Sequence, residues 1–217
     1  YDFTKKILKT FTLKHSYSST ITVGGMQTNL NATVDANGNA TARDLNNNFI
    51  APMQVQNIAI SEKFAPLIGI NATWTLFGKT LMTNFEYKKD RNATLSLANN
   101  QITENLGKEI VIGTTFTYPK LKLPIKSIKP SDLIVNFNFG FKDNLTVIRK
   151  VVENTNQATA GQKTVNIKID ANYKLTEFLT AIFNYEQGII NPKVQTSVPT
   201  GNLKINLAIR FDLNGLR

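Results

Sequence analysis

Few residues in this sequence have a type and spacing that could support catalysis or metal binding. His15 is the one histidine, and a catalytic base or zinc ligand would need convergent partners around it. No such partner follows at a recognisable spacing, so we interpret His15 as a structural or interfacial residue. Cysteine is absent, which excludes disulfides, thiolate zinc sites and iron–sulfur clusters.

Asp35, Asn37 and Asn39 imitate the first ligand positions of a calcium-binding loop. That loop requires a glycine at its sixth position, where this sequence has Ala40, and a closing glutamate, which is missing. An Asn-Gly turn is therefore the better interpretation. Phosphate-binding glycine loops and nucleophile elbows are absent as well. The sequence thus predicts no catalytic site, no metal site and no cofactor, in a protein that is not an enzyme.

The remaining candidates are polar side chains that alternate with apolar ones. In residues 203–214 every odd position is apolar, from Leu203 to Leu213, whereas the even positions are polar except for one alanine. Successive side chains of a strand point to opposite faces, so this strand has one apolar and one polar face. About 9–11 alternating residues suffice for a tilted strand to cross a bilayer, and we predict a transmembrane barrel strand here.

The polar face of such strands would line the lumen of the barrel. The predicted lumen-facing residues are Asn136, Asn138, Lys142, Lys168, Asp170, Glu186, Lys204, Arg210 and Asp212. Polar groups of this kind lose hydration in the narrow, filled lumen of an eight-strand barrel. We therefore predict that the strands do not close on themselves, and that the first and last strands pair with strands from elsewhere.

The same alternation recurs along the whole chain, residues 1–217, which we interpret as one β-barrel segment. Strands are predicted at residues 10–23, 68–76, 81–90, 110–118, 133–145, 165–173, 179–185 and 203–214. A tight turn centred on Gly78 would join the second strand to the third. The sequence accordingly predicts an all-β fold of about eight antiparallel, up-and-down transmembrane strands.

Long polar segments alternate with shorter connections between these strands. The long ones are predicted at residues 24–66, 98–108, 152–163 and 188–201, and the first of them would be the long outer loop. In membrane barrels the long loops are extracellular and the short turns periplasmic. Aromatic residues near the strand ends would then form a girdle at the periplasmic interface, made of Phe11, Trp74, Tyr118, Tyr173, Phe178 and Phe211.

Charge and hydropathy narrow the class of protein further. The net charge is +10 and the mean hydropathy is −0.18. The lysines are spread along the chain without a nucleic-acid-binding motif, so we expect solvated lysines and no nucleic acid partner. The sequence has no run of about 18 apolar residues, so it predicts no transmembrane helix. The N-terminal residues have no apolar signal-peptide region, so we expect a mature product or a fragment.

Two alternatives to a segment of a large barrel stay open at this point. The first is a small stand-alone outer-membrane barrel that acts as a porin or an adhesin. The second is a soluble lipid-binding β-barrel, because soluble barrels and sandwiches show the same alternation with the apolar face inward.

Four long segments carry a resemblance to a known family. They are LKTFTLKHSYSST (8–20), DLNNNFIAP (44–52), NFEYKKDRNATLSLA (84–98) and DNLTVIRKVVENTNQATAGQ (143–162). They resemble the extreme C-terminal part of the SprA (Sov) family, and the similarity runs through nearly the whole chain. This family is the outer-membrane translocon of type IX protein secretion, which is also needed for gliding motility.

The resemblance implies that these strands are the closing part of a much larger barrel, since single-chain barrels reach 36 strands. It implies a protein-conducting channel in the outer membrane of a Gram-negative bacterium, which exports folded cargo to the cell surface. The implied partners are the remainder of the SprA-like barrel, a PorV-type shuttle barrel, a plug protein, periplasmic subunits, secreted cargo proteins and outer-membrane lipids. In one departure, many barrel proteins end on an aromatic residue, whereas this sequence continues past Phe211 to Arg217.

Overall fold

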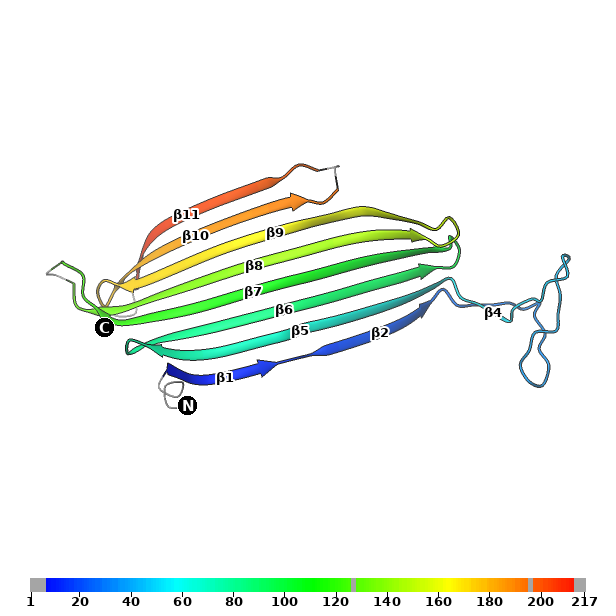
Figure 1. The fold of residues 1–217 in the computed structure, drawn as a ribbon, viewed down its shortest axis with the longest axis horizontal. Coiled ribbons are helices and arrows are strands. Elements are labelled where there is room, and N and C mark those ends of the chain that lie inside the picture. Colours follow the sequence, from blue (N-terminus) through cyan, green and yellow to red (C-terminus); the bar gives the residue numbers. More distant parts are fainter. Residues whose placement is uncertain (1–6, 126–127, 195–196, 213–217) are drawn as a thin grey trace.

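The computed structural model describes residues 7–125, 128–194 and 197–212. Over these residues the chain forms eleven strands, nine of which make one large antiparallel sheet (Figure 1). The strands are β1 (Leu8–Lys14), β2 (Tyr17–Gly24), β3 (Gln27–Thr28), β4 (Met53–Gln54), β5 (Asn57–Leu76), β6 (Lys79–Ser96), β7 (Gln101–Leu121), β8 (Ser131–Lys150), β9 (Thr155–Lys174), β10 (Leu179–Pro192) and β11 (Thr200–Phe211).

The large sheet is open. From β5 to β11 the strands follow each other across the sheet in chain order, and β1 and β2 both pair with β5 at one edge. Among the described strands, β11 pairs with β10 alone, so it forms the opposite edge (Figure 1). The all-β antiparallel fold is confirmed, and so is the prediction that the first and last strands do not pair with each other.

In the described part of the chain, no helix has the length and apolarity that crossing a membrane would take.

Most strands are longer than the sequence predicted. Residues 98–108 and 152–163 were predicted as loops, which is wrong, because β7 begins at Gln101 and β9 at Thr155. The segments 24–66 and 188–201 are likewise shortened, by the start of β5 at Asn57 and the end of β10 at Pro192. Neighbouring strands satisfy each other's backbone hydrogen bonds. Segments of polar residues can therefore stay paired as strands even where apolar side chains do not alternate.

The predicted tight turn between β5 and β6 is confirmed. Phe77 has φ 51° and Gly78 has φ 73°, and these two residues alone separate the paired strands. Two consecutive residues with positive φ are typical of the two-residue hairpin turns whose twist matches that of the strands. The β9–β10 connection at residues 175–178 and the start of β1 lie at this same end of the sheet (Figure 1). We call this end the turn end.

The first predicted strand, residues 10–23, is interrupted. His15 and Ser16 separate β1 from β2, opposite a register shift of β5 between Phe64 and Ile68. Pro66 cannot donate a ladder hydrogen bond, so the pairing breaks there. The backbone N–H of Ser16 instead donates to the Pro66 carbonyl at 2.9 Å. Beyond the break the two strands pair again, with Tyr17 opposite Phe64.

The sheet is a single layer without a packed core. Within the described residues, Ala72 and Tyr173 are the only buried hydrophobic residues. Large apolar side chains are instead exposed, and on β11 they include Leu203, Leu207 and Phe211. Stability in this fold therefore depends on what covers the two faces of the sheet.

Candidate functional site

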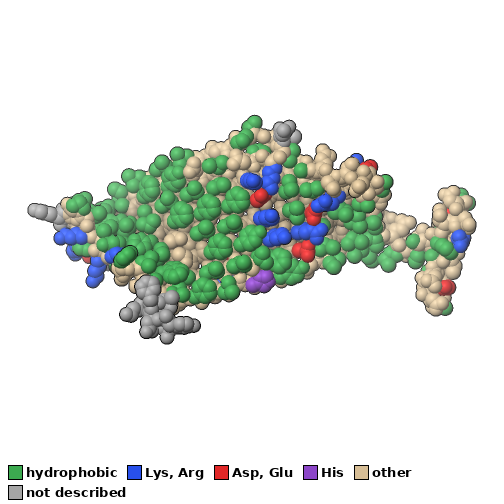
Figure 2. All heavy atoms as spheres, viewed as in Figure 1, with side chains coloured by type: hydrophobic (Ala, Val, Ile, Leu, Met, Phe, Trp, Pro, Cys, Tyr) green, Lys and Arg blue, Asp and Glu red, His purple; other side chains and the backbone are tan. Residues whose placement is uncertain are grey.

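One face of the sheet carries an apolar band, which we define by nine-residue segments of five strands. These segments are Ile110–Tyr118 on β7, Leu133–Phe141 on β8, Val165–Tyr173 on β9, Ala181–Ile189 on β10 and Leu203–Phe211 on β11. The strand register aligns them, because Phe139 lies opposite both Ile112 and Ile167. Nine residues extend about 30 Å, and a tilted strand of that length matches a bilayer core. Figure 2 shows the continuous apolar surface.

The opposite face is polar across the same strands. Asn138 lies opposite Gly113 and Lys168, and Lys168 lies opposite Glu186, which in turn lies opposite Lys204. The register thus places on one face Asn136, Asn138, Lys142, Lys168, Asp170, Glu186, Lys204 and Arg210. The ninth predicted residue, Asp212, follows the end of β11, and its backbone N–H donates to the Phe178 carbonyl at 2.8 Å.

Side chains on the polar face are partly hydrogen-bonded and partly hydrated. Asn184 Nδ2 donates to Asp170 Oδ1 at 2.6 Å, and Lys168 Nζ lies 3.5 Å from the same carboxylate. Thr115 Oγ1 donates to Asn136 Oδ1 at 2.8 Å. The Lys168 side chain remains 53% exposed, so its ammonium group keeps water around it. This face therefore suits contact with bulk water.

The polar face is also the hollowed one. A depression of about 600 Å³ is lined mainly by its amide, hydroxyl and carboxylate groups, among them Asn71, Asn84, Asn138 and Asp170. The side-chain amides of Asn71 and Asn84 lie 2.7 Å apart across β5 and β6. Sequence reasoning did not include these two residues in the site, although their alternation with Ile70 and Phe85 is a signal that could have placed them there.

An ion-pair network lies on the same face as the apolar band but nearer to the loops. Glu104 is only 5% exposed and accepts hydrogen bonds from Arg91 Nε at 2.6 Å and Arg149 Nη2 at 2.7 Å. Arg91 also pairs with Glu62 at 3.0 Å. Hydrogen bonds from Arg91 and then Arg149 hold the pKa of Glu104 below its ordinary value. Sequence analysis missed this network because its residues lie in segments assigned to loops or not assigned to any strand.

The predicted aromatic girdle lies at the turn end. The rings of Phe178 and Phe211 are 6.4 Å apart, and the Tyr173 hydroxyl donates to the Leu121 carbonyl at 2.8 Å. The remaining members are close to this end as well, namely Phe11, Trp74 and Tyr118. Lys79 Nζ lies 3.4 Å from the centre of the Tyr118 ring, a cation–π contact at the edge of the band.

A second aromatic group, which the sequence did not reveal, lies near the opposite boundary of the band. Tyr17 and Phe64 have ring centres 4.6 Å apart, and His15 lies 6.0 Å from Phe64. Nδ1 of His15 donates to the Leu67 carbonyl at 2.7 Å, which agrees with a structural or interfacial histidine. The strand interruption at Pro66 brings these residues together, and no alternation pattern could have predicted that.

The arm formed by residues 25–56 extends from the end of the sheet opposite the turn end (Figure 1). Asp35 Oδ1 accepts hydrogen bonds from the backbone N–H groups of Asn37 at 2.8 Å and Asn39 at 2.9 Å. Asp44 forms the same turn nine residues later, with the backbone N–H groups of Asn46 and Asn48. The amides of Asn39 and Asn48 are the main reason that the pKa values of the two carboxylates are lowered. Both carboxylates therefore stabilise turns.

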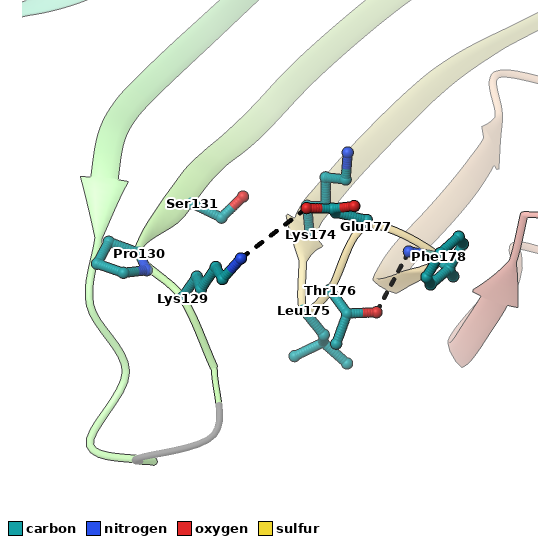
Figure 3. Close-up of a pocket in the computed structure, with 8 residues that line it drawn as sticks. All are labelled: Lys129, Pro130, Ser131, Lys174, Leu175, Thr176, Glu177 and Phe178. Carbon is teal, nitrogen blue, oxygen red and sulfur yellow. Dashed lines mark hydrogen bonds and ion pairs between the residues drawn. The ribbon is translucent and has the colours of Figure 1, made fainter. Parts of the chain in front are cut away.

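Figure 3 shows a hollow of about 490 Å³ at the turn end, between the segment before β8 and the β9–β10 turn. Lys129 Nζ lies 3.9 Å from Glu177 Oε1, and both side chains are largely exposed. Exposed pairs of this kind contribute little free energy. Thr176 Oγ1 accepts a hydrogen bond from the Phe178 backbone N–H at 3.3 Å, which closes the turn. These contacts explain the shape of the turn and assemble no catalytic group.

Over the described residues, no three His, Cys, Asp or Glu side chains converge in a way that could hold a metal ion. Comparison with known proteins adds no assignment: no protein-family model matches the chain, and no curated protein matches its sequence.

Proposed function

We propose that this chain is a wall segment of a protein-conducting channel in the outer membrane of a Gram-negative bacterium. The observation that carries the proposal is a single-layer sheet with an exposed apolar band on one face and a hollowed polar surface on the other. Exposed apolar patches on soluble monomers rarely exceed a few hundred Å². A band across five strands is stable when lipid covers it.

The polar face supports a wide, water-filled lumen. Closing eight strands would give a narrow lumen filled by side chains, in which Lys168, Glu186 and Lys204 would lose their water. The sheet instead keeps both edges open. An unpaired edge in lipid leaves several backbone groups unsatisfied, so strands from the remainder of a larger barrel pair with β1, β2 and β11.

The mechanism of such a wall is geometric, and no catalytic chemistry is proposed for this chain. A hydrated surface of amides and paired charges offers little adhesion to a folded cargo protein. The resemblance to the SprA family supports export by type IX secretion and a role in gliding motility. On that proposal, a PorV-type shuttle barrel, a plug protein and periplasmic subunits provide gating and cargo delivery.

Two observations argue against the alternatives. A soluble lipid-binding barrel needs an apolar concave face, whereas the hollow here is lined by Asn84, Asn138 and Asp170. A small stand-alone porin or adhesin needs a closed ring, whereas β11 pairs with β10 alone among the described strands.

The experiment that tests the proposal combines the mass of the parent polypeptide with an export assay. A parent polypeptide of thousands of residues in the detergent-extracted outer membrane supports the translocon. Replacing wall residues by apolar ones, as in N136L/N138L, makes the lumen adhesive, and we expect less cargo at the cell surface. Phe137→Leu is the matched control, since Phe137 lies between these residues on the apolar face.

Unchanged export by N136L/N138L, with the variant present in the membrane at the normal level, would contradict the proposed lumen. A parent polypeptide no longer than this chain would instead favour a small stand-alone barrel.

A further inference from the structure

We propose that four lysines at the loop-side boundary of the apolar band form a binding site for the phosphorylated head group of a membrane lipid. This lysine row consists of Lys89, Lys108, Lys163 and Lys193. The inference rests on the proposed function in one respect, namely that the apolar band faces lipid.

The strand register places these residues in one line. Lys89 on β6 lies opposite Lys108 on β7, and Lys108 lies opposite Asp143 on β8. Asp143 lies opposite Lys163 on β9, and the ammonium group of Lys193 is ion-paired with the Asp143 carboxylate. Directly opposite residues have Cβ atoms about 4.5–5.5 Å apart, so neighbouring ammonium groups can reach a common anion.

The lysine row has a surplus of positive charge. It combines four ammonium groups with the single carboxylate of Asp143. Within the described residues, Lys89, Lys108 and Lys163 form no ion pair, and all three are exposed. Like charges directly opposite each other destabilise a sheet unless an anion compensates them.

The neighbouring ion-pair network shows what compensated charge looks like on this face. Arg91 and Arg149 are each paired with a carboxylate, and Glu104 serves both arginines. The strand register places the lysine row between that network and the apolar band. Figure 2 shows blue and red side chains grouped beside the apolar surface. Lys89, Lys108 and Lys163 have no such carboxylate among the described residues, so an anion from outside can take this position.

The position of the row favours a lipid over a free anion. The next row of residues toward the turn end is apolar and includes Tyr87, Ile110, Phe141 and Val165. A lipid bound here would place its acyl chains on those side chains and its head group at the ammonium groups. Charge-assisted hydrogen bonds from lysine to phosphate then replace the missing ion pairs, and clustered lysines at a bilayer surface attract anionic lipids.

The test uses the membrane assembly that contains this chain, transferred into phosphatidylcholine nanodiscs. Diphosphorylated lipid A is the probe, dephosphorylated lipid A is the control lipid, and mass spectrometry counts the lipid retained per protein. For the variant K89Q/K108Q/K163Q we expect retention of the phosphorylated lipid to fall about tenfold or more. The matched variant K142Q/K168Q/K204Q removes the same charge from the polar face, and its retention should change less than about twofold.

Equal retention by wild type and K89Q/K108Q/K163Q would overturn the lysine row, as would an equal loss in both variants or equal retention of the two lipids. Labelling by an apolar carbene probe dissolved in the bilayer separates this result from the proposed function. Labelled peptides from 133–141 without lysine-dependent retention would overturn the head-group site alone. Absence of label from those peptides would contradict the membrane position of the band, and with it both proposals.

Discussion

The long strands of this sheet have two halves that differ on one face only. In the turn half, which holds the apolar band, Phe137 and Phe139 alternate with Asn136 and Asn138. In the loop half, between the lysine row and the loops, the polar face continues unchanged, with Asn105 opposite both Asn92 and Thr146. The other face changes from a continuous apolar surface to a mixed one, where the lysines and the Glu104 network lie among apolar residues such as Leu106 and Leu145.

The comparison separates the length of the strands, which backbone pairing sets, from the environment of their two faces, which the side chains set. Backbone pairing runs without interruption through both halves of β6 and β7, so hydrogen bonding alone sets the length of the strands. The environment of one face changes at the lysine row, in the middle of the strands. The turn half therefore depends on an apolar solvent around it, whereas the loop half combines apolar side chains with ion pairs of its own.

The largest effect is expected from a charge placed in the middle of the apolar band. Leu207 is at the centre of the β11 segment and is 77% exposed. Leu207→Arg should destabilise the folded chain by about 2–4 kcal/mol if its position is at the bilayer midplane. A denaturant titration in lipid vesicles measures this cost. Asn206→Arg, on the polar face, is the control and should cost far less, so equal costs would contradict the assignment of the two faces.

A smaller loss is expected in the loop half when the Glu104 carboxylate is removed. Glu104→Gln leaves Arg91 and Arg149 without their shared partner, but both arginines are more than 40% exposed and can be rehydrated. We expect a loss of about 1–3 kcal/mol in the free energy of unfolding. Glu62→Gln is the control, because its partly exposed ion pair with Arg91 and its 3.3 Å hydrogen bond from the Tyr17 hydroxyl should together contribute about 1 kcal/mol or less.

The same variant has a defined pH dependence. Because the pKa of Glu104 is lowered from 4.5, its contribution is complete above pH 4.5 and is lost as the pH falls through the lowered pKa. The stability difference between wild type and Glu104→Gln should therefore be constant near neutral pH and shrink in acid. A difference that grows as the pH falls below 4.5 would show that the network is not held by an ionised carboxylate.

A weaker effect is expected at the turn end of the band. Tyr173 is buried, and its hydroxyl donates to the Leu121 carbonyl. Tyr173→Phe removes this hydrogen bond and should cost about 0.5–1.5 kcal/mol in the same titration. Tyr185→Phe on the band is a useful comparison, because among the described residues the Tyr185 hydroxyl donates to the Gln187 side chain alone. A larger loss in the free energy of unfolding for Tyr185→Phe than for Tyr173→Phe would contradict the placement of the band's boundary near Tyr173.

The two ends of the sheet should also differ in access to protease, without a change in stability. Protease added to intact cells should cut the arm at residues 25–56, where Leu30 and Leu45 are fully exposed, because exposed loop tips are preferred sites. The turn at Phe77 and Gly78 should stay intact. Mass spectrometry of the fragments gives the sites, and cleavage at that turn with the membrane unbroken would reverse the proposed topology.

Apolar alternation predicted the turn half well and the loop half poorly. Residues 133–141 and 165–173 were assigned to strands because every second side chain is apolar. Residues 101–108 contain Glu104 and Lys108 at positions that alternation expects to be apolar, so they resembled a loop. Their strand structure comes from pairing with β6 and β8, which a local pattern does not contain.

The site shows the same limit. Eight of the nine predicted lumen residues share one face, because every second side chain of an uninterrupted strand points to the same side. The break at Pro66 inserts two extra residues of β5 relative to β6, so the register shifts while the two faces are kept, with Phe64 opposite Lys89 and Ile68 opposite Tyr87. It also brings His15, Tyr17 and Phe64 together. The lysine row and the Glu104 network join residues from strands far apart in sequence, so only the register could reveal them.

The break between β1 and β2 determines which strands this edge can accept. A regular strand that pairs along β1 loses its register at His15 and Ser16, where the chain turns its backbone bonds toward Pro66 and Ala65. The edge at β11 is a regular twelve-residue strand, so it does not complement the broken edge. A β11 edge paired with this edge would therefore lose its register at the break. A neighbouring strand that pairs along the whole of this edge needs a matching irregularity opposite His15 and Ser16, because the backbone groups it meets change register there.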